Sequence, residues 1–298
     1  MNELMPILEK GDEIRIISSA RKISRSELNP ALVFFRKQGF NPTLGKNIFK
    51  EEHQFAGSDQ ERLEDLQNAI NDPHLKVIWM ARGGYGTHRV IKELDISPLL
   101  KKPKWIIGYS DVSVLHCLLN ANNIRSLHAT MPVNFKDQGP DSFIKALEVL
   151  KGNYPEYKIK AHPLNKNGKA KGKLYGGNLS ILYSLNGSEI LPIMKDAILF
   201  FEDLDEYLYH IDRIMQNFSL SGILNEIKGL IIGGLSDMND NLVPYGKTAE
   251  EIVFEHVNSL EIPVCFGFPA GHQKENFPLL LGEEILLNVD NDHTIITY

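Results

Sequence analysis

The stretches Ala81-Arg82-Gly83-Gly84-Tyr85-Gly86 and Gly108-Tyr109-Ser110-Asp111 decide how this chain folds. Each stretch follows a short apolar run and precedes a segment with the apolar spacing of a helix. Ser110 is therefore expected at a turn from a strand into a helix, where a hydroxyl is exposed above a sheet and free N–H groups can stabilise an oxyanion. The glycines of the first stretch allow a ligand to approach the backbone closely. Together the two turns predict the floor of an active site.

The first half of the chain alternates between expected strands and expected helices. The strands are predicted at residues 13–18, 75–80, 104–108 and 126–131, and the helices at residues 26–37, 58–72, 90–94, 111–120 and 141–151. Ser58 and Glu61 have the spacing of a capping box, which marks the start of one of these helices. This alternation predicts an α/β fold with a mainly parallel sheet, in which ligands bind beyond the carboxyl ends of the strands. Both turns lie at such ends.

The second half of the chain has a different pattern. Residues 152–173 are rich in Lys, Asn, Gly and Pro and have weak apolar periodicity, as expected of a crossing between domains. We therefore predict an N-terminal α/β domain at 1–155, a linker at 156–169 and a smaller C-terminal mixed β domain at 170–298. The strands expected in the second half are residues 197–201, 228–235, 264–268, 284–289 and 294–298, and the helices are 206–218 and 248–258.

The composition restricts the classes of function that the chain can have. The 298 residues are 43% hydrophobic and 23% charged, as in ordinary globular proteins. The net charge of −6 gives no electrostatic reason to expect nucleic acid or an anionic membrane as a partner. The sequence has no signal-peptide pattern and no apolar run long enough to span a membrane. Cys117 and Cys265 lie in apolar runs and are expected to be buried thiols, which favours a cytoplasmic location.

A catalytic Ser110 would need a base, and the base would need a carboxylate to orient it. His272 lies in a Gly/Pro-shaped loop directly after an expected strand, which is a favourable place for a general base. Glu202 ends the apolar strand at 197–201 and is placed to hold a histidine's second ring nitrogen. Three other histidines near the central turns compete for the role of base: His88, His116 and His128. From the residues alone, Ser110 could also be only a helix cap.

The acidic residues that follow Glu202 raise the alternative of a metal site. Asp203, Asp205 and Glu206 come next, and His210 lies one helical turn after Glu206. This spacing matches no zinc or calcium signature, and acidic residues at a helix start commonly complement the helix dipole. No dinucleotide fingerprint or P-loop occurs either. We therefore predict neither a metal nor another cofactor.

Taken together, these motifs resemble the LD-carboxypeptidase family of serine peptidases, the muramoyltetrapeptide carboxypeptidase type, which also includes microcin C immunity proteins. Each motif is short, but their order along the chain and their places at strand ends make the set specific. The resemblance covers nearly the whole chain and rests on residues 82–86, 108–111, 176–179, 201–203 and 269–272.

The resemblance implies roles for particular residues. Ser110 would be the nucleophile, His272 the general base and Glu202 the residue that orients the histidine. The backbone N–H groups of Gly84 and Asp111 would form the oxyanion hole, and each such donor is typically worth about 3–4 kcal/mol in the transition state. The resemblance also implies a C-terminal domain of the swivelling β/β/α type, and a homodimer.

The implied activity is hydrolysis of the amide before the C-terminal D-alanine of murein tetrapeptides during cell-wall recycling. The substrate would then be a small muropeptide with a free carboxylate, which Arg82 could bind, and Tyr85 is expected to contact it as well. A structural salt bridge is the alternative for Arg82. Two other functions stay open, namely hydrolysis of acyl-adenylates like microcin C and non-catalytic binding of muropeptides.

Overall fold

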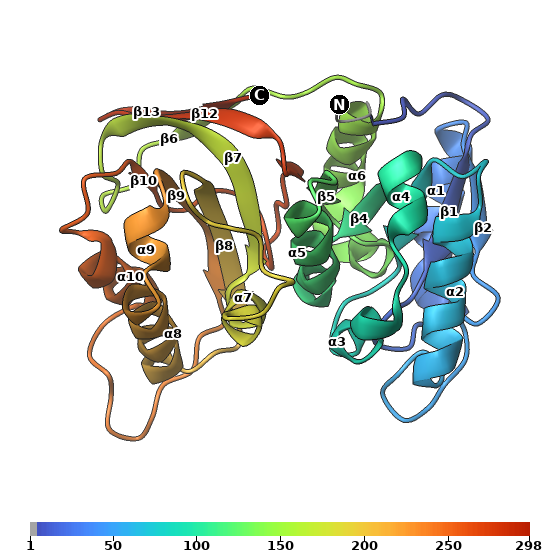
Figure 1. Ribbon diagram of the computed structural model, residues 1–298, viewed down its shortest axis with the longest axis horizontal. Helices are drawn as coiled ribbons and strands as arrows, with labels where there is room; N and C mark the ends of the chain where they lie inside the picture. The colour runs from blue at the N-terminus through green and yellow to red at the C-terminus, as the bar shows by residue number, and fades with distance from the viewer. Residues whose placement is uncertain (1–4) are drawn as a thin grey trace.

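The computed structural model describes residues 5–298, which form two β-sheets side by side with helices packed on them (Figure 1). The first sheet has six strands in the order β11-β5-β4-β3-β1-β2, parallel except for β11. Its strands are β1 (Glu13–Ile17), β2 (Asn41–Leu44), β3 (Val77–Met80), β4 (Trp105–Gly108), β5 (Ser126–His128) and β11 (Leu279–Leu281). The predicted parallel sheet is therefore confirmed.

Every residue of β3 and β4 is buried, because helices cover both faces of the sheet. Val77 and Trp79 pack into a core with α1 (Arg25–Lys37) and α6 (Phe135–Leu150). Ile78 and Met80 point to the opposite face. The core there includes residues of α2 (Asp59–Asn71) and α5 (Ser113–Ala121), and the remaining short helices of this half are α3 (Thr87–Val90) and α4 (Ser97–Lys101).

The helix starts show where local sequence signals decide the structure. The capping box predicted at Ser58 is present, with Ser58 accepting from the backbone of Glu61 and the Glu61 carboxylate accepting from the backbone of Ser58. By contrast, α6 begins at Phe135, six residues before the expected start at 141. The early start reflects two helical pieces joined across Gly139, which has a φ of 70°.

The second sheet has seven strands in the order β10-β9-β8-β7-β12-β13-β6. The strands from β7 to β10 pair in parallel and the others pair antiparallel, so the sheet is mixed. Its strands are β6 (Tyr157–Lys160), β7 (Gly168–Asn178), β8 (Ile198–Leu204), β9 (Gly229–Ser236), β10 (Val264–Cys265), β12 (Glu284–Val289) and β13 (His293–Thr297). Its helices are α7 (Leu179–Leu185), α8 (Leu208–Leu220), α9 (Ile223–Glu226) and α10 (Ala249–Val257).

Two strands depart from the organisation expected from the sequence. The expected linker at 156–169 contains β6, an edge strand of the second sheet, and the first residues of β7. In addition, β11 comes from the C-terminal half of the chain but pairs with β5 at the edge of the first sheet. Both strands are short and depend on partners far away in sequence. The exact division at 155 and 170 stays a prediction.

A buried contact joins the two sheets beside the turn that carries Ser110. The Ser113 hydroxyl, at the start of α5, accepts a hydrogen bond of 2.9 Å from the backbone N–H of Asn178, the last residue of β7. The side-chain amide of Asn178 donates to the carboxylate of Asp203 at 2.7 Å. Gly177 is required at this contact, because a Cβ there would lie 2.3 Å from the Ser113 hydroxyl.

No helix among residues 5–298 combines the length and the apolar character needed to cross a membrane. Cys117 and Cys265 are both buried and free, as the sequence predicts.

Substitution Asn178→Ala is expected to lower the free energy of unfolding by about 2 kcal/mol, because it leaves the buried Asp203 carboxylate without its side-chain donor. Urea denaturation followed by circular dichroism measures this change. Asn122→Ala is the matched control, since the Asn122 amide bonds only an exposed carbonyl of its own helix. The Asn178 contact is unimportant for stability if the two variants unfold at the same urea concentration.

Candidate active site

Ser110 lies on the predicted turn from strand to helix. The chain leaves β4 at Gly108, and Ser110 begins a short 3₁₀ turn that leads into α5. Ser110 has a φ of 64°, in the left-handed region that residues with side chains seldom occupy. Strain of this kind persists only where the surroundings impose it, and it is common at functional sites. The half-buried side chain faces the cavity described below.

The glycine turn after β3 packs directly against Ser110. A Cβ at Gly83 would lie 2.9 Å from the Ser110 Cβ and 3.0 Å from its Oγ, so only glycine allows this approach. The two turns are also tied together by Asp111, whose buried carboxylate accepts a 2.9 Å hydrogen bond from the backbone of Thr87 at the end of the glycine turn. Burial raises the pKa of Asp111, although the hydrogen bonds from Thr87 oppose this effect.

His272 and Glu202 form a pair on the opposite wall, in which the Glu202 side chain is fully buried and the His272 side chain is 16% exposed. The Nδ1 of His272 lies 2.7 Å from the Oε2 of Glu202, and the backbone N–H of His272 donates to the same oxygen at 3.1 Å. Glu202 lies near the end of β8 and is fully buried, so the carboxylate has a fixed position. The hydrogen bond places the proton on Nδ1 in the neutral imidazole and leaves Nε2 free to accept one.

The charges of this pair shift both pKa values in the directions expected of an ion pair. Burial alone would lower the pKa of His272, but the charge of Glu202 and its hydrogen bond outweigh burial and raise it above 6.5. Burial alone would raise the pKa of Glu202, but His272, through its charge and hydrogen bonds, and to a smaller extent His128 lower it below 4.5. The carboxylate therefore stays ionised at neutral pH and stabilises a protonated imidazole.

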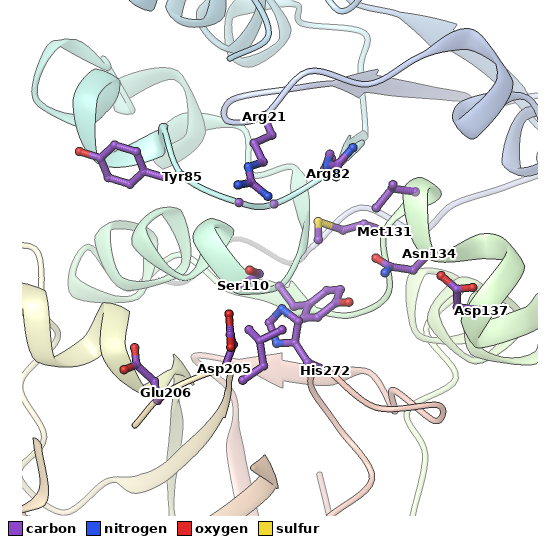
Figure 2. A pocket seen from close by; sticks show the side chains of 15 residues that line it. Arg21, Arg82, Tyr85, Ser110, Met131, Asn134, Asp137, Asp205, Glu206 and His272 are labelled. Carbon is purple, nitrogen blue, oxygen red and sulfur yellow. The ribbon is translucent and has the colours of Figure 1, made fainter. Parts of the chain in front are cut away.

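Ser110 and His272 line one cavity of about 620 Å³ between the two halves of the structure (Figure 2). Its other lining residues are Arg21, Arg82, Gly83, Gly84, Tyr85, Tyr109, Met131, Val133, Asn134, Asp137, Leu204, Asp205 and Glu206. Within residues 5–298 no hydrogen bond joins the hydroxyl of Ser110 to His272. Catalytic hydrogen bonds commonly tighten only when substrate is bound, so the shared cavity is the relevant geometry.

The other histidines near the central turns have different surroundings. His116 is buried between the Ser126 hydroxyl and the carbonyl of Gly108, and burial lowers its pKa to about 4. His128 is also fully buried, and burial lowers its pKa to about 3. His88 bonds Ser184, on α7. None of the three lines the cavity, so of these four histidines only His272 shares the cavity with Ser110.

The acidic residues after Glu202 are held by separate partners. Asp203 accepts from Asn178 and from the backbone of Ser180, and burial raises its pKa to about 7 despite these bonds. The Glu206 carboxylate lies 2.5 Å from Nδ1 of His210. Within the part of the chain that the structure describes, no group of three or more His, Cys, Asp or Glu side chains could hold a metal ion.

The two residues expected to bind substrate both line the cavity, but Arg82 already has partners. Its guanidinium lies 3.2 Å from the Glu27 carboxylate and donates to the carbonyl of Lys22 at 3.3 Å. Tyr85 is 47% exposed, and its ring packs near Phe55 with centroids 6.2 Å apart. The sequence interpretation missed Arg21, which lies close to the glycine turn only because β1 and β3 are neighbours in the sheet.

The fold and the cavity define an α/β protein in which a serine and a histidine line one cleft, with a buried glutamate hydrogen-bonded behind the histidine. Residues 14–129 match the LD-carboxypeptidase N-terminal domain, and residues 171–287 match the LD-carboxypeptidase C-terminal domain. The chain belongs to the LD-carboxypeptidase family.

Individual relatives agree with this family. The probable murein peptide carboxypeptidase of Bacillus subtilis is 30% identical over 97% of this chain and 92% of that protein. The microcin C7 self-immunity protein MccF of Escherichia coli is 27% identical over 97% of this chain and 94% of that protein. The crystal structure of muramoyltetrapeptide carboxypeptidase from Oxalobacter formigenes matches with a TM-score of 0.86 at 27% identity, covering 95% of this chain and 97% of that one. The family and fold class expected from the sequence are thus confirmed.

Substitution Gly83→Ala is expected to reduce activity while leaving the fold intact, because the added Cβ would push against Ser110. A displacement near 1 Å at the reacting group typically costs about 100-fold in rate. Steady-state kinetics would measure kcat, and circular dichroism would verify the fold. Unchanged kcat in a folded variant would show that the approach of the two turns is not needed for catalysis.

Proposed function

We propose that this protein is a serine LD-carboxypeptidase that releases the C-terminal D-alanine of murein tetrapeptides and leaves the tripeptide. The observation that carries the proposal is that Ser110 and His272 line one cavity, with His272 hydrogen-bonded to the buried Glu202 behind it. A binding module would need neither a nucleophile nor an oriented base. Membership of the LD-carboxypeptidase family supports the substrate class.

In the proposed reaction the Ser110 oxygen attacks the carbonyl carbon of the L-configured centre while His272 Nε2 takes the hydroxyl proton. The carbonyl oxygen becomes an oxyanion that accepts hydrogen bonds from the backbone N–H groups of Gly84 and Asp111. Collapse of this intermediate breaks the amide bond, and the imidazolium gives its proton to the nitrogen of the departing D-alanine. A water then attacks the acyl-serine carbonyl while His272 Nε2 takes a proton from it. Collapse of this second intermediate breaks the ester bond, and the imidazolium returns the proton to the Ser110 oxygen, which releases the tripeptide and restores Ser110.

Glu202 supports both proton transfers without taking the proton itself. Its carboxylate accepts from Nδ1 of His272, which keeps Nε2 free to act as base, and its charge stabilises the imidazolium that forms after the first transfer. Because the backbone N–H of His272 bonds the same oxygen, the loop and the ring are fixed together.

Substitution Ser110→Ala is expected to lower kcat by about 10⁴-fold or more, because it removes the nucleophile. The measurement is D-alanine release from purified murein tetrapeptide with a chelator present. Ser219→Ala is the matched control, since Ser219 is exposed on α8 and away from the cavity. The mechanism fails if Ser110→Ala keeps wild-type turnover.

The raised pKa of His272 predicts the acid side of the pH profile. The imidazole must be neutral to act as base, so kcat/KM is expected to fall as pH decreases through a pKa above 6.5. Substitution Glu202→Gln removes the charge that raises this pKa. The fall should then move to lower pH, and kcat should decrease by about 100-fold or more while staying measurable. Superimposable pH profiles for the two proteins would contradict the role given to Glu202.

The relative MccF supports a second candidate, the hydrolysis of acyl-adenylates resembling microcin C. The proposed triad could attack that carbonyl in the same way, so the two candidates differ in the leaving group. An assay of the wild type with each substrate distinguishes them. Turnover of neither, together with binding of muropeptide, would favour the non-catalytic module.

A homodimer is also part of this proposal, and light scattering in solution would test it.

A further inference from the structure

The side chain of Arg21 lies over the glycine turn at the edge of the cavity (Figure 2). Its backbone N–H donates to the carbonyl of Gly83 at 3.4 Å, and its carbonyl accepts from the Ser18 hydroxyl at 2.7 Å. A Cβ on Gly84 would lie 2.5 Å from Cδ and 2.6 Å from Cγ of Arg21. The arginine stem therefore rests on the residue proposed to donate to the oxyanion.

The guanidinium of Arg21 has no charge partner among the residues that the structure describes. Within residues 5–298 it makes no salt bridge and no side-chain hydrogen bond, whereas the guanidinium of Arg82 contacts Glu27 and the carbonyl of Lys22. The acidic side chains of Asp205 and Glu206 lie across the cavity, on the other side of Ser110 (Figure 2). The wall beside the glycine turn thus presents an unpaired cation to any ligand.

We propose that Arg21 binds the free carboxylate of the departing C-terminal residue and so makes the enzyme an exopeptidase. This inference rests on the proposed function. In a peptide the terminal carboxylate carbon is separated from the scissile carbonyl carbon by only the amide nitrogen and one Cα, roughly 4 Å in total. A substrate whose carbonyl oxygen reaches Gly84 must therefore place its carboxylate near the same turn, where Arg21 lies.

The chemistry of the side chain suits this role. A guanidinium presents a planar set of donors that matches a carboxylate with two parallel hydrogen bonds, which a neutral C-terminal amide cannot reproduce. The hydrogen bonds of the Arg21 backbone to Gly83 and Ser18 hold its Cα beside the glycine turn. The carboxylate role expected of Arg82 from the sequence is thereby transferred to Arg21. Arg82 instead holds the Lys22 carbonyl in the same loop.

The test compares two substrates, the murein tetrapeptide and its C-terminal amide, in wild type and in Arg21→Gln. We expect the wild type to prefer the free acid in kcat/KM by roughly 10- to 100-fold, the range of a hydrogen bond to a charged group. Arg21→Gln should lose most of its kcat/KM for the acid and little for the amide, so that the preference approaches unity. Arg21→Lys should keep part of the preference, and Arg36→Gln, on the exposed end of α1, should keep all of it.

An unchanged preference in Arg21→Gln overturns the proposal, as does an equal loss for both substrates, which would mean a structural role. Loss of the preference only in Arg82→Gln would identify Arg82 as the carboxylate ligand. Calorimetric binding of the same two peptides to Ser110→Ala, with and without Arg21→Gln, gives the answer independently of turnover. If the wild type shows no turnover but the free acid binds more tightly than the amide, and this difference disappears in Arg21→Gln, the carboxylate site is supported and the proposed reaction is refuted. If the free acid and the amide bind with equal affinity, the proposed role of Arg21 as the carboxylate ligand is refuted.

Discussion

The hydrogen bonds of Asn178 are the constraint on which this site depends. Asn178 is paired in register with Glu202 across β7 and β8, and its backbone N–H bonds the Ser113 hydroxyl three residues after Ser110. The same asparagine holds Asp203, the neighbour of Glu202, through its side chain. One residue therefore links the strand that carries the Glu202 carboxylate to the helix that follows Ser110, although the strand and the helix lie in different halves of the structure.

The burial of the Glu202 carboxylate requires His272 as its partner. Removing a carboxylate from water costs several kcal/mol unless charge and hydrogen bonds compensate, and His272 supplies both through Nδ1 and its backbone N–H. By this reasoning the pair contributes little to the net free energy of folding, and its main effect is on the position and protonation of the imidazole. A fixed, ionised carboxylate keeps the His272 imidazole in one tautomer and raises its pKa above 6.5.

The local part of the fold could be predicted because it depends on neighbours in sequence. Apolar runs with no polar alternation marked β3 and β4, and the Ser58 capping box marked the start of α2. By contrast, β7 has a glycine- and lysine-rich sequence without strand periodicity and forms because β8 and β12 pair with it on both sides. For the same reason the strand β11 was not predicted from the sequence, since its partner β5 lies about half the chain away.

The sequence by itself determined the family and the α/β class, and it predicted roles for Ser110, Glu202 and His272, because each of these residues lies in a short motif at a strand end. Only the tertiary structure decided that the serine and histidine share a cavity and that three other histidines do not reach it. It also decided that Arg82 is paired with Glu27 while Arg21 has no ion-pair partner within residues 5–298. These facts depend on contacts between residues distant along the chain. Packing and pairing of the two sheets fix such contacts, and no local pattern encodes them.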